Sequence, residues 1–215
     1  MKKIVTEFIA TYILIFAGTG VVIADQSFGG AAGLQGIAAV WGFVIIALIY
    51  AFGDISGTHI NPAVTVSFAA DKRFEWRDVP GYLAAQFTGA IAASLTLHYL
   101  FPTHTTLAAT SPAIDVTRAF ILETMMMFIL MMVILRVSVG AKEKGITAGI
   151  AIGGTVWLLV LFAGPITGTS LNPARSFAPA LVSNNWTSIW IYLTAPFAGG
   201  LLAVITHRFI HNNEN

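Results

Sequence analysis

The sequence predicts an all-α polytopic membrane protein in which six transmembrane helices and two half-helices form an inverted repeat. Its 215 residues are 56% hydrophobic and only 10% charged, whereas a soluble domain carries about 25% charged residues. The apolar residues form long unbroken runs, not the alternating pattern of a β-barrel, so helical spans are expected. A twelve-residue stretch occurs twice, at 53–64 and 164–175, with seven identical positions. Both copies place Gly, Asn and Pro inside apolar sequence, which predicts irregular backbone at membrane depth.

Six nearly uncharged runs approach the roughly 20 residues that cross a hydrocarbon core about 30 Å thick. We expect spans at about 4–24, 34–52, 79–101, 117–138, 145–164 and 186–208. Glu7 interrupts the first run near its start, so a membrane span is expected there and not a cleaved signal peptide. The apolar segments 63–70 and 174–182 follow the repeated stretches and are too short to cross, which predicts half-helices. Residues 71–78 are a charged connector, and residues 101–115 are a polar loop at the midpoint.

The basic residues predict that both termini face the cytoplasm. With this orientation nine of eleven Lys and Arg residues lie on the cytoplasmic side, as the positive-inside rule requires. These nine are Lys2, Lys3, Lys72, Arg73, Arg77, Arg136, Lys142, Lys144 and Arg208. We expect one channel domain over 1–215, built from inverted halves at about 1–110 and 111–215, in the inner or plasma membrane of a bacterial-type cell. Inverted repeats with broken helices place a functional site near the midplane, where the halves meet.

Each repeated stretch ends in an Asn-Pro-Ala triplet, which has the chemistry of a helix start. Asn61 and Asn172 are strong N-cap residues, and Pro62 and Pro173 suit the first helical position. The side-chain oxygen of each Asn is expected to cap its helix and leave the NH₂ group free to donate to a solute. The pore centre is therefore assigned to both triplets, Asn61, Pro62, Ala63, Asn172, Pro173 and Ala174.

The residues before each triplet, 57–60 and 168–171, are expected to be extended. Non-helical backbone at this depth is tolerated where it lines a polar cavity. We therefore expect pore-lining carbonyl groups from Gly57, Thr58, His59, Gly168, Thr169 and Ser170.

Three charged residues are predicted to lie inside the membrane, where charges usually mark a pathway or a paired site. Arg175 has Val64 as its repeat counterpart, and carbonyl groups of the loop before it are its expected partners. Glu7 and Glu123 open the first span of each half, and they are either proton carriers or acceptors for N–H groups of the loops. Their repeat-related positions favour structural support, because two symmetric half-helices need two symmetric supports.

Several function classes are excluded or made unfavourable by the composition. The chain has no cysteine, its five histidines lack ligand spacing, and its net charge is +1, so neither a metal site nor a nucleic-acid partner is expected. No catalytic motif or cofactor-binding loop is present, so we expect no enzyme activity and no cofactor. An alternating-access transporter is the main alternative, because such carriers also use inverted repeats and broken helices. A non-conducting scaffold is the least favoured alternative.

These features together resemble the aquaporins of the major intrinsic protein family. The resemblance rests on residues 56–64 and 167–176, on Glu7 and Glu123, and on the spacing of the six spans. It implies a right-handed bundle of six helices and two half-helices, with one pore in each subunit of a homotetramer. It also implies membrane lipid, water and small neutral solutes as partners.

The resemblance further implies a narrow outer selectivity filter at Trp41, Val160, Thr169 and Arg175. Water-selective members have His where Val160 stands, so a wider and partly apolar filter is expected. Glycerol facilitators have Gly and Phe in place of Val160 and Thr169, and Asp in place of Ser176. The combination is most similar to nodulin-26-like channels.

The expected function is a passive channel for water and small uncharged solutes that excludes protons and ions. Glycerol-like polyols and arsenous, boric or silicic acid are the expected solutes. A water-selective aquaporin is the alternative.

Overall fold

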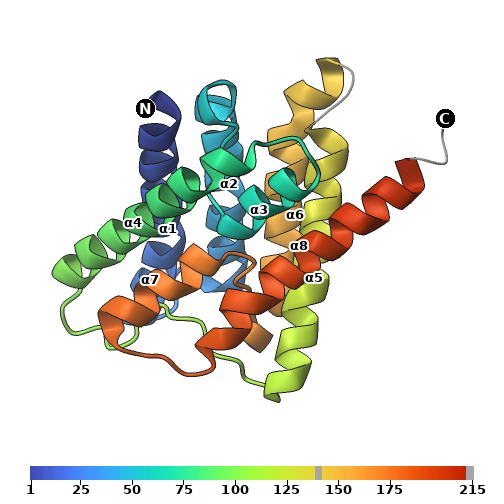
Figure 1. Cartoon of the computed structure of the whole chain (residues 1–215). Helices are drawn as coiled ribbons and strands as arrows, with labels where there is room; N and C mark the ends of the chain where they lie inside the picture. Colours follow the sequence, from blue (N-terminus) through green and yellow to red (C-terminus); the bar gives the residue numbers. More distant parts are fainter. Residues whose placement is uncertain (139–141, 212–215) are drawn as a thin grey trace.

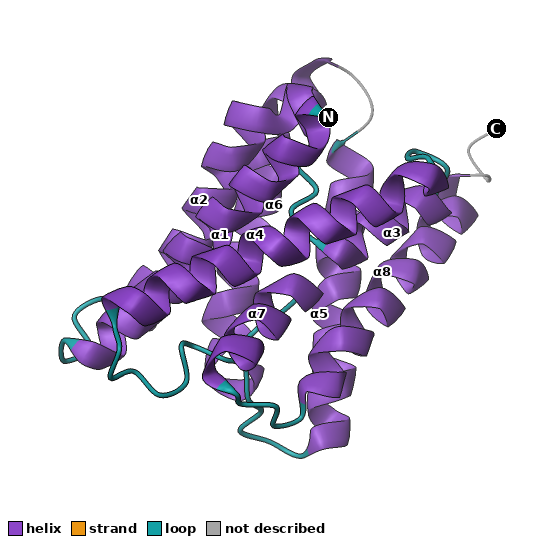
Figure 2. Cartoon of the chain, turned by 60° about the vertical axis from the view of Figure 1, so that its left-hand side comes forward, coloured by secondary structure: helices purple, strands orange, loops and turns teal. Residues whose placement is uncertain are grey.

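The computed structural model describes residues 1–138 and 142–211, without the side chains of 142–146 and 211. These residues form eight α-helices and one short 3-10 helix, joined by loops (Figure 2). In chain order they are α1 (Lys2–Ser27), α2 (Gly33–Ser56), α3 (Pro62–Ala70), η1 (Trp76–Asp78), α4 (Val79–Leu100), α5 (Val116–Val137), α6 (Lys142–Thr167), α7 (Pro173–Ser183) and α8 (Ile189–His211). The helical fold class and the two half-helices, α3 and α7, are as predicted.

Five of the described helices, α1, α2, α5, α6 and α8, are long and apolar enough to cross a membrane. The helix α4 is also long enough with 22 residues, but buried polar side chains such as Gln86 and Ser94 make it less apolar. It packs along α1, as α8 packs along α5. The six expected spans therefore correspond to α1, α2, α4, α5, α6 and α8.

The packing of the helices follows the sequence repeat. Each half-helix packs against the last long helix of the other half, α3 against α8 and α7 against α4. The helices α2 and α6 join the halves directly. Figure 1 shows α4 and α8 crossing the bundle obliquely, and it shows the start of α1 and the end of α8 at the same end of the molecule. The prediction that the halves divide near residue 110 remains untested.

Two glycines allow the oblique helices to approach their partners closely. A Cβ atom on Gly89 of α4 would collide with the backbone carbonyl of Phe8 in α1. A Cβ atom on Gly199 of α8 would collide with the carbonyl of Thr124 in α5. Small residues permit this close approach of helix backbones in membrane proteins. Phe8 and Thr124 directly follow Glu7 and Glu123 in the chain. The two helix crossings therefore help to fix the positions of both carboxylates inside the bundle.

Several predicted helix ends differ from the observed ones by two to four residues, and the two that matter for the site lie at the repeated stretches. The helix α2 continues beyond residue 52 to Ser56, and α6 continues beyond residue 164 to Thr167 through Pro165. Each ends at a glycine with positive φ, 82° at Gly57 and 79° at Gly168. The N–H groups of these glycines donate to the carbonyls of Gly53 and Gly164, both at 3.0 Å. A glycine in the left-handed conformation commonly ends a helix. Gly53 and Pro165, next to which the helix ends were predicted, do not end these helices.

Candidate functional site

The two Asn-Pro-Ala triplets begin the half-helices as predicted. The Oδ1 atom of Asn61 accepts a hydrogen bond from the N–H of Ala63 at 2.9 Å. The Oδ1 atom of Asn172 accepts from Ala174 at 3.0 Å and from Arg175 at 3.4 Å. Proline occupies the first turn of both α3 and α7, where its missing N–H group costs no helical hydrogen bond.

The side-chain amides of the two Asn residues tie the triplets together. The Nδ2 atom of Asn61 donates to the carbonyl of Leu171 at 2.9 Å, and Nδ2 of Asn172 donates to the carbonyl of Ile60 at 2.8 Å. The expectation that both NH₂ groups are entirely free was therefore wrong. Each carbonyl lies just before the opposite triplet, so one amide hydrogen is used for this cross-link. An NH₂ group has two hydrogens, and within the described part of the chain each Nδ2 atom uses one of them.

The loops before the triplets are not extended, which corrects a second expectation. In the first loop φ is positive at Gly57, Thr58 and Ile60, with 82°, 47° and 45°. The second loop has the same pattern, with 79°, 42° and 57° at Gly168, Thr169 and Leu171. In this conformation two successive N–H groups of each loop, those of residues 59–60 and 170–171, point to one buried glutamate.

Glu7 and Glu123 are fully buried and accept the N–H groups of the two loops. Glu7 accepts from the backbone of His59 at 2.9 Å and of Ile60 at 2.7 Å. Glu123 accepts from the backbone of Ser170 at 3.0 Å and of Leu171 at 3.1 Å. The hydroxyls of Ser56 and Thr167 add one bond each, at 2.8 and 2.6 Å. These contacts are the ones expected if both glutamates act as acceptors for N–H groups of the loops.

Three further supports were missed from the sequence. Gln86 donates to Glu7 and to Thr65, both at 2.9 Å. The hydroxyl of Tyr82 donates to the carbonyl of Ser56 at 2.8 Å, and that of Tyr192 donates to the carbonyl of Thr167 at 2.7 Å. The two tyrosines are 110 residues apart, close to the 111-residue repeat offset. Extending the repeat comparison into α4 and α8 would have revealed this pair, whereas no repeat signal marks Gln86.

Because the loop N–H groups turn toward the glutamates, the loop carbonyls turn elsewhere. Within the described residues, the carbonyls of Gly57, Thr58, His59, Gly168, Thr169 and Ser170 accept no hydrogen bond from protein. A buried carbonyl without a partner is costly, so these groups are suited to the wall of a wet cavity. Their assignment as pore-lining groups remains a prediction.

Arg175 is buried in the first turn of α7, with 4% of its surface exposed. Its Nη1 atom donates to the carbonyl of Ala108 at 2.9 Å, and its Cζ atom lies 5.1 Å from the centre of the Trp41 ring. The expectation that carbonyls of residues 168–171 hold this side chain was wrong. The Nε atom of Arg175 has no partner among the described residues, so the guanidinium keeps donor capacity.

The loop that supplies Ala108 was predicted as a polar loop at the midpoint, and part of it folds inward. Leu107 and Ala108 are buried, and φ is positive at both, 48° and 58°. Thr110 donates to the Ser176 hydroxyl at 2.8 Å, and this hydroxyl lies 2.6 Å from that of Ser170. The midpoint loop is thereby fastened to the start of α7. The apolar Leu-Ala-Ala run at residues 107–109 could have indicated that this part of the loop is buried.

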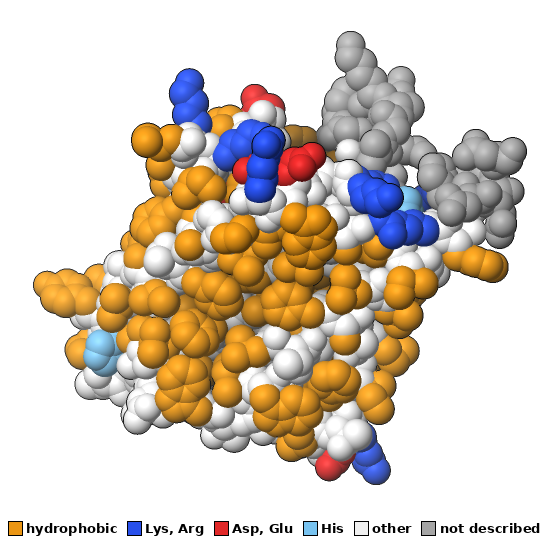
Figure 3. All heavy atoms as spheres, viewed as in Figure 1, with side chains coloured by type: hydrophobic (Ala, Val, Ile, Leu, Met, Phe, Trp, Pro, Cys, Tyr) orange, Lys and Arg blue, Asp and Glu red, His pale blue; other side chains and the backbone are white. Residues whose placement is uncertain are grey.

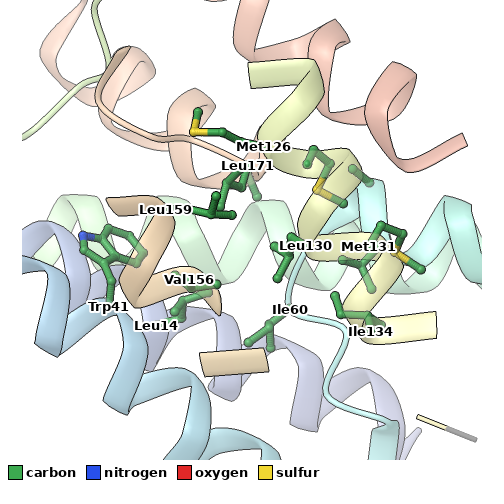
Figure 4. Packing of buried hydrophobic residues seen from close by; sticks show 14 of the residues in the cluster. Leu14, Trp41, Ile60, Met126, Leu130, Met131, Ile134, Val156, Leu159 and Leu171 are labelled. Atoms are coloured by element: carbon green, nitrogen blue, oxygen red, sulfur yellow. The ribbon is translucent and has the colours of Figure 1, made fainter. Parts of the chain in front are cut away.

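A cavity of about 640 Å³ runs along the two loops and past both Asn residues. Its lining includes Trp41, Val160 and Thr169 as well as Arg73 and Ser138. Its wall is two-sided, because the loops supply polar groups and the helices supply apolar side chains. The apolar side includes Leu14, Ile45, Leu130, Ile134, Ile152 and Val156. Figure 4 shows such side chains from α1, α2, α5 and α6 beside Ile60 and Leu171 of the loops.

Comparison with known proteins identifies the family. The family model described as "Major intrinsic protein" matches residues 1–207. The chain belongs to the major intrinsic protein family. Aquaporin NIP1-1 of Oryza sativa subsp. japonica is 44% identical over 211 residues, which are 98% of this chain and 74% of that protein. Aquaporin NIP6-1 of Arabidopsis thaliana is 42% identical over 209 residues, which are 97% of this chain and 68% of that protein.

The fold of this major intrinsic protein also matches a solved structure. The X-ray structure of the aquaglyceroporin from Plasmodium falciparum aligns with a TM-score of 0.84 at 25% identity, covering 96% of this chain and 94% of that chain. The chain is therefore a multi-pass membrane channel for water and small solutes. Membership of this family agrees with the expectation that the chain is not an enzyme. The plant relatives give no support to the expected bacterial-type membrane.

Proposed function

We propose that this channel passively conducts water, glycerol-like polyols and uncharged metalloid hydroxides such as arsenous, boric and silicic acid, and that it excludes protons and ions. The observation that carries this proposal is the Arg175 guanidinium 5.1 Å from the Trp41 ring, because this ring lines the same cavity as the small apolar side chain of Val160. A solute with hydroxyl groups on one edge and C–H groups on the other matches this pairing. We assign Trp41, Val160, Thr169 and Arg175 to the selectivity filter.

The exclusion of cations follows from the arrangement of the half-helices. The N-termini of α3 and α7 meet at the cross-linked Asn61 and Asn172, so the positive ends of two helix dipoles lie together. Half-helix dipoles and a filter Arg form the established charge barrier of aquaporin-type pores. We propose that the free amide hydrogens of Asn61 and Asn172 orient the oxygen atoms of a solute at this centre.

The contacts of the glutamates favour a channel over an alternating-access carrier. A carrier needs a carboxylate that exchanges protons or ions with the substrate pathway. Both oxygens of Glu7 and of Glu123 instead accept loop hydrogen bonds. We assign Glu7 and Glu123 to structural support of the loops.

We also propose that the termini face the cytoplasm and that the protein is a homotetramer. Figure 1 shows the start of α1 and the end of α8 at one end, and the positive-inside rule assigns that end to the cytoplasm. The tetramer rests on the family resemblance alone. A bacterial-type inner or plasma membrane remains a prediction.

The proposed solute range is tested by stopped-flow light scattering of proteoliposomes. We expect wild-type protein to speed the flux of water, glycerol and boric acid above that of protein-free vesicles. Accelerated water flux without any glycerol or boric acid flux would favour the alternative, a water-selective aquaporin.

Replacing Gly18 by Ala is expected to lower glycerol flux severalfold. A Cβ atom on Gly18 would lie 2.5 Å from the Trp41 ring, so the ring must move away from α1. One misplaced methyl group in a fitted site changes selectivity about tenfold or more. Gly20→Ala is the matched control, because its Cβ atom would lie 3.4 Å from Leu97, an ordinary contact. Equal glycerol flux in the two variants, measured by stopped flow at equal protein density, would show that Gly18 does not position Trp41.

A further inference from the structure

A second cavity, of about 460 Å³, lies between the start of α1 and the start of α4. Lys2, Lys3 and Ile4 line it from one side, and Arg77, Asp78 and Tyr82 from the other. The two sides are more than 70 residues apart in the sequence, so the fold brings their charges together. This cavity is separate from the pore.

The charge of this cavity is unbalanced. Its wall has three cationic side chains, Lys2, Lys3 and Arg77, and one carboxylate, that of Asp78. None of these cations forms an ion pair within the part of the chain that the structure describes. The neighbouring Glu75 is exposed and does not line the cavity. The site therefore has an excess of positive charge that an anion would complement.

The start of α1 adds to this positive character. This helix begins at Lys2, and no side-chain hydrogen bond caps its first turn. Uncapped N–H groups at a helix start favour a negative group. The start of α4 adds little, because the N–H of Val79 donates to the carbonyl of Trp76 and Pro80 has no N–H.

The surroundings of the cavity identify the kind of anion. Directly along α1, Val5, Phe8 and Ile9 expose 51%, 37% and 42% of their surfaces. Trp76 in η1 is 58% exposed, and Trp is enriched at the boundary between membrane and water. Figure 3 shows Lys and Arg side chains grouped at the end with the N-terminus, beside a broad hydrophobic surface. This boundary suits an amphipathic anion that has its polar head at the cations and its apolar chain along α1.

We propose that this cavity binds the phosphate headgroup of an anionic phospholipid, with an acyl chain along Val5, Phe8 and Ile9. Basic pockets between transmembrane helices are suited to such headgroups. The floor of the site is Tyr82, whose hydroxyl donates to the carbonyl of Ser56 at 2.8 Å. Its ring centre is 5.0 Å from that of His59 in the first pore loop. Bound lipid therefore stabilises a support of that loop.

The test compares two triple variants with equal loss of charge. In Lys2→Gln/Lys3→Gln/Arg77→Gln the cavity loses its three cationic side chains. In the control, Lys72→Gln/Arg118→Gln/Arg136→Gln, three exposed cations outside the cavity are removed. Native mass spectrometry of the detergent-solubilised full chain measures binding of phosphatidylglycerol and of phosphatidylcholine. Thermal unfolding with and without phosphatidylglycerol shows whether each variant is folded and whether lipid stabilises it.

We expect wild type and the control to bind phosphatidylglycerol about tenfold more tightly than phosphatidylcholine, and the cavity variant to lose this preference. The lipid should raise the unfolding temperature of wild type more than that of the cavity variant. An equal preference in both triple variants would overturn the proposal. Competition by inorganic phosphate at millimolar concentration would also overturn it, in favour of a free-anion site. This test needs no solute flux, so its result is independent of the proposed selectivity.

Discussion

Replacing Val160 with His is expected to lower glycerol flux about tenfold or more, because one added group in a fitted apolar site discriminates by about 10–200-fold. Val160 is 5% exposed and lines the same cavity as Trp41 and Thr169. An imidazole ring is larger than an isopropyl group, and it replaces an apolar contact for C–H groups with a polar one. Water is small enough to pass a narrower, more polar ring, so its flux is expected to change about twofold or less on the same reasoning.

The measurement for this variant is stopped-flow flux of both solutes in the same vesicle preparation. Val160→Thr is the control, since Thr has nearly the shape of Val and should retain glycerol flux within a factor of about three. If Val160→His conducts glycerol as well as wild type does, Val160 is not part of the filter.

Replacing Glu123 with Leu is expected to prevent stable folding or to lower stability strongly. The substitution leaves the Thr167 hydroxyl and the N–H groups of Ser170 and Leu171 without their acceptor. Each buried donor left unsatisfied costs about 1–3 kcal/mol. The sum, about 3–9 kcal/mol, is comparable to the whole stability of a domain, about 5–15 kcal/mol. Thermal unfolding in detergent measures the loss.

Two control variants distinguish this structural role of Glu123 from a role in ion-coupled transport. Met125→Leu changes a side chain on the same helix that is 57% exposed, so it should unfold like wild type. Glu123→Gln retains one acceptor oxygen and should be less destabilised than Glu123→Leu. Glycerol flux through Glu123→Gln should persist without any ion dependence. Ion-dependent uptake that Glu123→Gln abolishes would instead support a carrier.

The repeated motif made the centre of the site predictable from sequence. Asn at an N-cap and Pro in the first turn have few other uses in apolar sequence, so the starts of α3 and α7 were predicted correctly. The repeat also paired Glu7 with Glu123. The contacts of both carboxylates with the loops follow from the need to satisfy N–H groups at membrane depth.

The features that sequence did not predict depend on contacts between distant segments. The partner of Arg175 is the carbonyl of Ala108, and a backbone carbonyl is present at every residue, so it leaves no sequence signal. The cross-links from Asn61 and Asn172 to carbonyls of the opposite loop are of the same kind. The left-handed loop conformation was missed because residues such as Thr58 rarely adopt positive φ. The acceptance of two successive loop N–H groups by one buried carboxylate explains this conformation.

The most direct test of a passive, charge-excluding channel is to measure glycerol flux and proton leak on the same wild-type vesicles. Light scattering reports glycerol entry over a range of concentrations, and a trapped pH-sensitive dye reports proton movement under an imposed pH gradient. We expect glycerol flux that rises linearly with the gradient, with a proton leak equal to that of protein-free vesicles. Saturable glycerol uptake that depends on a proton gradient, or a proton leak above that of protein-free vesicles, would contradict a passive channel that excludes charge.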